Sequence, residues 1–264
     1  IIASLLGIGG GVFLVPILTL GFGIDIKIAA ATSLVTIIVT SSTSASRYLE
    51  GGLVNVNLGV YLELFAIFGG IIGAIVAFYL QDYVIEAIFG AVLIYTAYYL
   101  LKTRDSESTI CREFDVARPK KESRFSGRFY DECSNKTFEY DVKNLAPGGG
   151  ASFVAGNLSG LIGVGGGIVN VPVMNLLMGV PMKAAVATSN FIIGVTAVAS
   201  TLIYLSNGLM APMIIAASSI GIFIGAVIGT RMLAKVKGET LRIAFAITIS
   251  VISIMMFARA GGWL

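Results

Sequence analysis

The chain has 264 residues, of which 56% are hydrophobic and only 12% are charged; its net charge is +3 and it lacks histidine. An ordinary soluble domain carries roughly 25% charged residues, so this composition excludes that class. The small net charge gives no sign of a nucleic-acid partner, and the lack of histidine excludes His-dependent catalysis and most zinc chemistry. We therefore expect no metal and no cofactor. Apolar runs of about 20 residues predict an all-α polytopic protein in a lipid bilayer.

The first half of the chain opens with a glycine cluster inside an apolar run. Gly7-Ile-Gly-Gly-Gly11 is followed by Pro16, within an interrupted segment of about 1–22. Three uninterrupted apolar spans follow, at about 28–46, 58–80 and 84–101. We interpret 1–101 as a first transmembrane repeat.

A polar insert of about 102–146 follows this repeat. Residues 102–143 hold 10 of the 18 Lys and Arg and 9 of the 15 Asp and Glu. Alternating apolar and polar residues on both sides of Ser134-Asn-Lys predict a small β-hairpin. The spacing of Cys111 and Cys133 fits neither a zinc motif nor a disulfide framework, so we expect free thiols. Regulation or partner binding by the insert stays open.

The second half repeats the first at an offset of 156 residues. Gly163-Val-Gly-Gly-Gly167 is followed by Pro172, and the register then holds without a gap from Lys27 and Lys183 onward. The predicted segments are an interrupted one at about 149–178 and spans at about 184–205, 210–231 and 240–258. A repeat of this length indicates a duplicated structural unit, with 147–264 as the second transmembrane repeat.

Each glycine-broken segment can be one crossing helix or a re-entrant hairpin. The arms Ala151–Ile162 and Ile168–Met178 are each about 17 Å long as helix, roughly half a bilayer. With hairpins, the basic insert lies on the same side as Arg47, Lys183 and the loop 231–242, as the positive-inside rule requires. We therefore predict inverted repeats, each a hairpin plus three transmembrane helices, with the insert 102–146 in the cytoplasm.

The glycine clusters predict an anion site. Glycine lets a ligand approach the main chain, and the helix that starts after each cluster offers free N–H groups and a positive dipole end. Two such ends near mid-membrane would converge on one cavity. The candidate backbone ligands are Gly9, Gly10, Gly11, Val12, Gly165, Gly166, Gly167 and Ile168.

Polar side chains early in the next span of each half are further candidates. Thr32, Ser33, Thr188, Ser189 and Asn190 can ligate an oxyanion without a buried charge, although each can instead bond its own helix. Three membrane-depth amides are expected to bond between helices: Asn157, Asn170 and Asn175. Glu63 is an acid deep in an apolar run, which makes it a candidate for ion coupling in one half only.

The repeated pattern resembles the TauE/SafE family of sulfite and organosulfonate exporters. The resemblance rests on Gly-x-Gly-Gly-Gly, a proline five residues later and Lys-x-Ala-x-Ala-Thr-Ser, present in both halves. It implies a secondary exporter of small sulfur-containing anions such as sulfite, sulfoacetate or thiosulfate. It also implies that the substrate path is surrounded by Gly9–Gly11, Pro16, Thr32, Ser33, Gly165–Gly167, Pro172, Thr188, Ser189 and Asn190. The long charged insert departs from the shortest members of the family.

The leading hypothesis is a cell-membrane transporter that moves a small oxyanion by alternating access. An anion channel would use the same donors without a closed intermediate. A membrane-embedded enzyme or sulfur-transfer protein is disfavoured, because histidine is lacking and both cysteines lie in the insert. The sequence leaves open the anion, the coupling ion and the oligomeric state, a homo-oligomer included.

Overall fold

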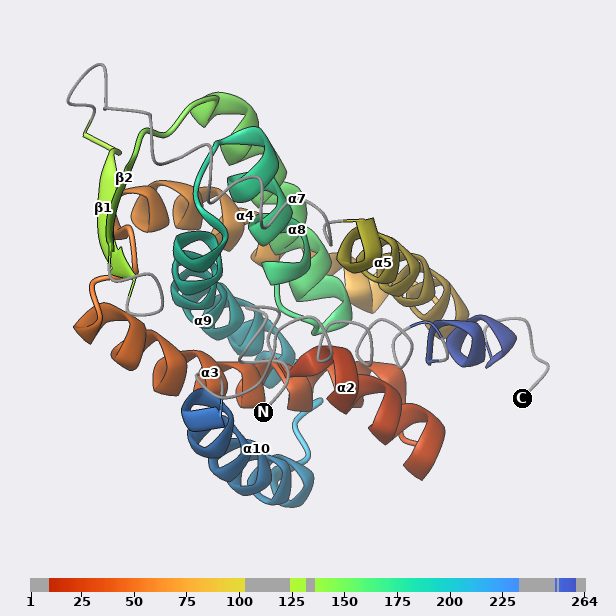
Figure 1. The fold of residues 1–264 in the computed structure, drawn as a ribbon. Helices are drawn as coiled ribbons and strands as arrows, with labels where there is room; N and C mark the ends of the chain where they lie inside the picture. Colours follow the sequence, from red (N-terminus) through yellow and green to blue (C-terminus); the bar gives the residue numbers. More distant parts are fainter. Residues whose placement is uncertain (1–9, 103–123, 132–135, 233–249, 251, 260–264) are drawn as a thin grey trace.

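The structure is a computed structural model that describes residues 10–102, 124–131, 136–232, 250 and 252–259 (Figure 1). The first half contains α2 (Gly11–Pro16), the π-helical turn η1 (Ile17–Gly21), α3 (Ile26–Glu50), α4 (Val56–Tyr79) and α5 (Asp82–Lys102). The insert and second half contain β1 (Gly127–Asp131), β2 (Lys136–Tyr140), α7 (Leu145–Ile162), α8 (Gly167–Pro172), the π-helical turn η3 (Val173–Leu177), α9 (Met182–Ser206) and α10 (Pro212–Met232).

The helices match the predicted membrane class. Within the described part of the chain, α3, α4 and α9 are long and apolar enough to cross a membrane. α5 and α10 cover the predicted spans at 84–101 and 210–231. Most of the predicted span at 240–258 lies outside the described residues, although residues 252–259 are helical.

The sequence duplication is also a duplication of structure. The elements α2, η1 and α3 have the same boundaries as α8, η3 and α9 once the offset of 156 residues is subtracted, and α4 and α10 start at equivalent positions. The residue before the long helix differs between the copies. Asp25 caps α3 by accepting the Lys27 N–H at 2.7 Å, whereas Pro181 precedes α9. The shared pattern of glycine, proline and apolar residues therefore determines the elements in both copies.

The second glycine-broken segment folds back on itself as a hairpin. Lys143 N–H donates to the carbonyl oxygen of Met178 at 3.0 Å, and Asn144 Nδ2 donates to that of Leu177 at 2.8 Å. The start of α7 and the end of η3 thus lie together, as the hairpin interpretation requires. Its first arm is longer than predicted, because α7 begins at Leu145 rather than near 151 and is about 27 Å long.

Helix α4 of the first half packs between α7 and α9 of the second half. A Cβ on Gly69 of α4 would overlap the carbonyl oxygen of Phe153, and one on Gly156 of α7 would overlap that of Ala66. Close approach of small residues is how helices pack in a bilayer, where water exclusion cannot drive them together. The contact of α10 with α3, which is equivalent to that of α4 with α9, is also present.

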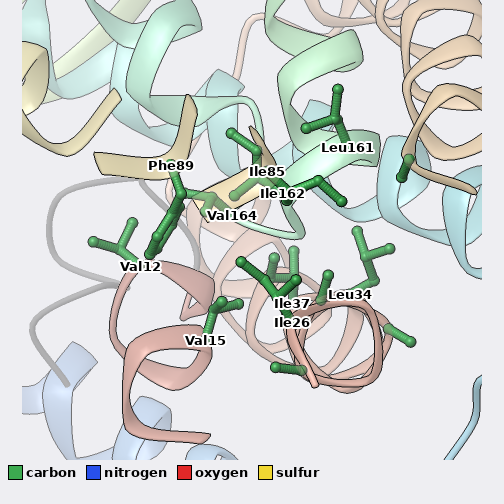
Figure 2. Packing of buried hydrophobic residues seen from close by; sticks show 14 of the residues in the cluster. Val12, Val15, Ile26, Leu34, Ile37, Ile85, Phe89, Leu161, Ile162 and Val164 are labelled. Atoms are coloured by element: carbon green, nitrogen blue, oxygen red, sulfur yellow. The ribbon is translucent and has the colours of Figure 1, made fainter. Parts of the chain in front are cut away.

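The apolar core joins both halves around the hairpin loop. Figure 2 shows Val12 and Val15 of α2 beside Phe89 of α5 and Val164 of the loop after α7. Nearby, α3 crosses α9, where the Ser41 hydroxyl donates to a backbone carbonyl of α9. The core thus fixes the position of the two glycine clusters relative to each other.

The insert contains the predicted β-hairpin, and it packs on one end of the helices. β1 and β2 are antiparallel, with Phe129 opposite Phe138. Lys136 of the predicted turn is the first residue of β2, whereas Ser134, Asn135 and both cysteines lie outside the described residues. Asn55, just before α4, donates from Nδ2 to the carbonyl oxygen of Phe125 at 2.8 Å and to the Tyr140 hydroxyl at 3.3 Å. Burial raises the pKa of the Tyr140 hydroxyl above its usual value, and the hydrogen bond from Asn55 offsets only part of this rise.

Charged residues join the helices at another place in the molecule. Lys27 at the start of α3 pairs with Asp82 at the start of α5, with Nζ and Oδ1 3.3 Å apart. Arg259 pairs with the buried Glu86 of α5 at 3.1 Å and also donates to the carbonyl oxygen of Thr19 in η1. The starts of α3 and α5 and the end of η1 are therefore held together.

Candidate functional site

The two glycine clusters meet inside the protein. Gly11, the first residue of α2, lies against the loop that joins α7 to α8. A Cβ on Gly11 would overlap the carbonyl oxygen of Gly163 and lie 2.8 Å from Cα of Val164. Only glycine allows this approach of two backbones. The structure thus places the last glycine of the first cluster beside the first glycine of the second; the convergence of the two helix starts stays a prediction.

The hairpin loop needs glycine for two reasons. Gly163 caps α7 in the left-handed conformation, with φ of 74°, and Gly165 has φ of 81°. L side chains rarely adopt these angles. A Cβ on Gly163 would also lie 2.6 Å from Cα of Ala30 in α3. Conformation and space therefore exclude a side chain at Gly163.

The predicted ligands of α3 have different environments. The Ser33 hydroxyl donates to the carbonyl oxygen of Gly163 at 2.5 Å, so it anchors the hairpin loop to α3. Thr32 is also fully buried, but its Oγ1 has no hydrogen-bond partner among the described residues. Buried hydroxyls without a partner are rare, so Thr32 is the better candidate for a ligand in this arrangement.

The equivalent polar residues of α9 are all buried: Thr188, Ser189 and Asn190. Thr188 Oγ1 accepts the N–H of Asn55, which joins α9 to the start of α4 at 3.0 Å. Asn190 Nδ2 donates to the carbonyl oxygen of Val186 at 3.1 Å, so this amide bonds its own helix, one of the two roles considered for it.

Both copies begin their first helix in the same way. The glycine just before the helix, Gly10 or Gly166, accepts hydrogen bonds at its carbonyl oxygen from the N–H groups three and four residues after it. Earlier N–H groups of a first helical turn have no acceptor within the helix, and they carry the positive end of its dipole. In α2 and α8 these groups belong to Gly11, Val12, Gly167 and Ile168. Gly9 lies outside the described residues.

A proline ends the α-helical part of each segment. Pro16 and Pro172 are the last residues of α2 and α8, and a π-helical turn follows both. Proline has no N–H and its ring displaces the carbonyl four residues earlier, which favours a local change of helical winding. Both prolines are buried, and their role is to shape the helix behind each glycine cluster.

Asn170 is a candidate that the sequence interpretation assigned to packing. It lies in α8, one turn after Gly166, and is 2% exposed. Its Nδ2 has no partner among the described residues, whereas Asn175 Nδ2 donates to the carbonyl oxygen of Val180. The duplication could not single out Asn170, because its counterpart is Leu14.

Glu63 is buried in α4 and has an unpartnered oxygen. Its side chain is 7% exposed, and its Oε1 has no hydrogen-bond partner among the described residues. Gly59, one turn earlier on α4, packs on the Thr188 side chain of α9. Glu63 therefore lies on the same row of α4, close to a predicted ligand.

An apolar pocket lies on the other side of the hairpin loop. Its volume is about 10 Å³, on the order of one water molecule. Its lining comes from α5, α7, the loop and α8: Val92, Ala155, Leu158, Ile162, Val164, Gly165, Gly166, Ile168 and Val169. The loop is thus tightly packed on this side as well as against Gly11.

Comparison with known proteins identifies the family. The family model described as "Sulfite exporter TauE/SafE" matches residues 1–256, almost the whole chain. The chain belongs to the TauE/SafE family. It is therefore a multi-pass membrane transporter, which confirms the resemblance seen in the repeated motif.

Curated relatives agree with this assignment. The chain is 28% identical to the probable membrane transporter protein YunE of Bacillus subtilis, over 95% of this chain and 90% of the relative. It is 27% identical to a probable membrane transporter protein of Methanocaldococcus jannaschii, over 97% and 90%. It is also 32% identical to the sulfite exporter TauE/SafE family protein 5 of Arabidopsis thaliana, over 51% and 31%. No solved structure matches the chain.

Proposed function

We propose that this TauE/SafE transporter exports a small sulfur-containing oxyanion, sulfite or an organosulfonate, by alternating access. The observation that carries the proposal is the contact between Gly11 of the first cluster and Gly163 and Val164 of the second. The start of α2, whose first N–H groups have no acceptor within the helix, lies there against the loop that leads to the start of α8, and such helix starts bind anions. The printed name of the family supports a sulfur oxyanion as the substrate.

The anion is held by neutral donors. Backbone N–H groups of α2 and α8 provide the positive ends of two helices, and Thr32 and Asn170 add side-chain donors. Both of these side chains are buried, and each has a polar atom without a partner among the described residues, which supports a ligand role. Neutral donors suit an anion that must also leave, because no buried cation holds it.

The two halves are inverted repeats in the membrane. Thr188 near the start of α9 bonds Asn55, which follows the end of α3, so these ends lie together. Tyr204 near the end of α9 packs on Phe78 near the end of α4, with ring centroids 5.3 Å apart. These contacts support antiparallel α3 and α9, although the two helices are copies of one element. Placing the insert in the cytoplasm then satisfies the positive-inside rule.

The described arrangement is a closed intermediate of the transport cycle. Gly11 and Gly163 are in van der Waals contact, which leaves no room for an oxyanion between their backbones. The anion enters when the two clusters move apart, and their contact re-forms behind it. A closed intermediate distinguishes this carrier from an anion channel with the same donors.

Purified protein in proteoliposomes tests the proposal. We expect saturable efflux of sulfite and of an organosulfonate such as methanesulfonate, with slow turnover and competition between the two anions. Empty liposomes and chloride as a competing anion are the controls. A lack of flux for both sulfur anions would refute the substrate, and large single-molecule currents would favour the channel.

A further inference from the structure

Glu63 is buried on α4, a helix that packs against two helices of the second half. Its helix, α4, packs against α7 and α9. A Cβ on Gly59 would lie 3.5 Å from Thr188 Cγ2, and one on Gly70 would lie 2.8 Å from Ser200 Oγ. Glu63 lies between these two glycines on the row that faces α9, and its side chain is 7% exposed.

In the described part of the chain, α7 and α9, the helices packed on α4, place no cation beside this carboxyl. Helix α7 carries no ionisable side chain, and those of α9 are Lys183 in its first turn and Tyr204 near its far end. The ionisable neighbours on α4 itself are Tyr61 and Tyr79. The insert adds Arg124 and Tyr140 beside the first residues of α4. Lys183 has interactions of its own.

A neutral carboxyl fits this place, and a charged one does not. Burying an ionised carboxylate without a partner is costly, so such a group stays protonated or becomes exposed to water. Glu63 Oε1 has no hydrogen-bond partner among the described residues, so the surroundings do little to stabilise a charge. These surroundings therefore favour the protonated form of Glu63.

The carboxyl lies on α4 one turn from the place where this helix meets Thr188, a predicted ligand of the anion. Gly59 contacts Thr188, and Glu63 lies one turn further along α4, about 6 Å. Two negative charges at such a separation repel strongly where water is excluded. Anion occupancy therefore favours the protonated form of Glu63, and protonation favours anion binding.

We propose that Glu63 is the proton-binding site that couples anion transport to proton movement, an inference that rests on the proposed function. The carboxylate takes a proton from water on the side where the anion enters. Anion and proton cross together while Gly11 and Gly163 rearrange, and the proton returns to water on the other side. The transported charge is thereby reduced by one for each anion.

Proton-coupled flux in proteoliposomes tests the proposal. Vesicles contain a pH-sensitive dye, and the anions are sulfite and methanesulfonate, the second of which stays ionised at every pH used. Wild-type protein is expected to move one proton with each methanesulfonate. As the pH rises through the range in which Glu63 loses its proton, the affinity for the anion should fall by up to about tenfold per pH unit. Glu63→Gln should fold, transport the anion without a proton and lose this pH dependence.

Two further variants serve as controls. Glu63→Asp keeps a carboxyl and should keep proton coupling, whereas Glu50→Gln, at the exposed end of α3, should match wild type. If Glu63→Gln does not fold, Glu63→Asp replaces it and must still move the proton. Anion flux without proton movement by the wild-type protein overturns the proposal. Proton coupling that persists in Glu63→Gln overturns it as well. A wild-type protein that moves neither anion refutes the proposed function instead.

Discussion

At the scale of single residues, the site depends on glycines, which carry no side chain to keep two backbones apart. Gly11 approaches Gly163 and Val164 so closely that even one methyl group would overlap the carbonyl oxygen of Gly163. Ser33 then uses its hydroxyl to hold that same oxygen. Thr32 and Asn170 differ, because each keeps a buried polar atom without a described partner. Glycine and Ser33 therefore build the site, whereas Thr32 and Asn170 are available to an anion.

Gly11→Ala should impair both stability and transport. The new methyl group overlaps the hairpin loop, and overpacking of this kind typically costs about 1–3 kcal/mol. Gly21→Ala is the matched control, because a Cβ there meets no atom within 4 Å. Thermal melting in detergent and sulfite efflux measure the two effects. Equal behaviour of the two variants would show that the clusters do not touch.

The variant Asn170→Leu distinguishes a ligand role of Asn170 from a packing role. Leucine occupies the equivalent position in the first copy, at residue 14. Since an unpaired buried amide costs about 1–3 kcal/mol, the variant should be as stable as wild type or more so. Anion affinity should fall roughly tenfold, which corresponds to about 1.4 kcal/mol. A destabilised variant with unchanged affinity would assign Asn170 to packing alone.

At the scale of elements, the first half supports the hairpin of the second. Helix α4 lies along α7, where Gly69 and Gly156 allow carbonyl oxygens of the partner helix to approach. α4 and the hairpin of α7 and α8 therefore form one closely packed unit made from both halves. In the proposed transport cycle, we expect this unit to move as one body when the glycine clusters separate.

Gly156→Ala should loosen this unit. Its Cβ would overlap the carbonyl oxygen of Ala66, so we expect a loss of about 1–3 kcal/mol of stability. Gly150→Ala in the same helix has open space and should stabilise α7 by up to about 1 kcal/mol. Melting temperatures of the two variants provide the comparison. A tolerated Gly156→Ala would contradict the close packing of α4 on α7.

The hairpin could be predicted from sequence because its causes are local. A glycine cluster and a proline recur at fixed spacing, and both act on the backbone of their own segment. The length of α7 could not be predicted, since Pro147 and the glycines after it are typical of a loop. Proline is tolerated in a first helical turn, and Gly148 and Gly149 leave room for Met178 and Phe65.

At the scale of the whole molecule, the elements of one half pack mainly on those of the other. Helix α4 contacts α9, and α10 makes the equivalent contact with α3. The duplication led us to expect that the two helix starts converge, and the structure shows Gly11 at the start of α2 against Gly163 and Val164, which precede α8. The bond from Asn55 to Thr188 was not predictable, because position 211, the counterpart of Asn55, is alanine and only one half has it.

Single-cysteine labelling tests the proposed orientation in the membrane. With Cys111 and Cys133 replaced, a cysteine at Gln81 should react with an impermeant reagent added outside intact cells. One at Glu50 should react only after the cells are opened. Both positions are exposed and lie in or beside helix ends. Reaction of the cysteine at Glu50 from outside would contradict a cytoplasmic insert.

An anion bound between the glycine clusters is the central claim, and anomalous diffraction can locate it. Selenite resembles sulfite and carries a selenium atom that can be identified at its absorption edge. In crystals soaked with selenite, we expect one peak within hydrogen-bonding distance of the first N–H groups of α2 and α8, beside Thr32 and Asn170. A peak elsewhere, or none between the clusters in protein that transports selenite, would contradict the account.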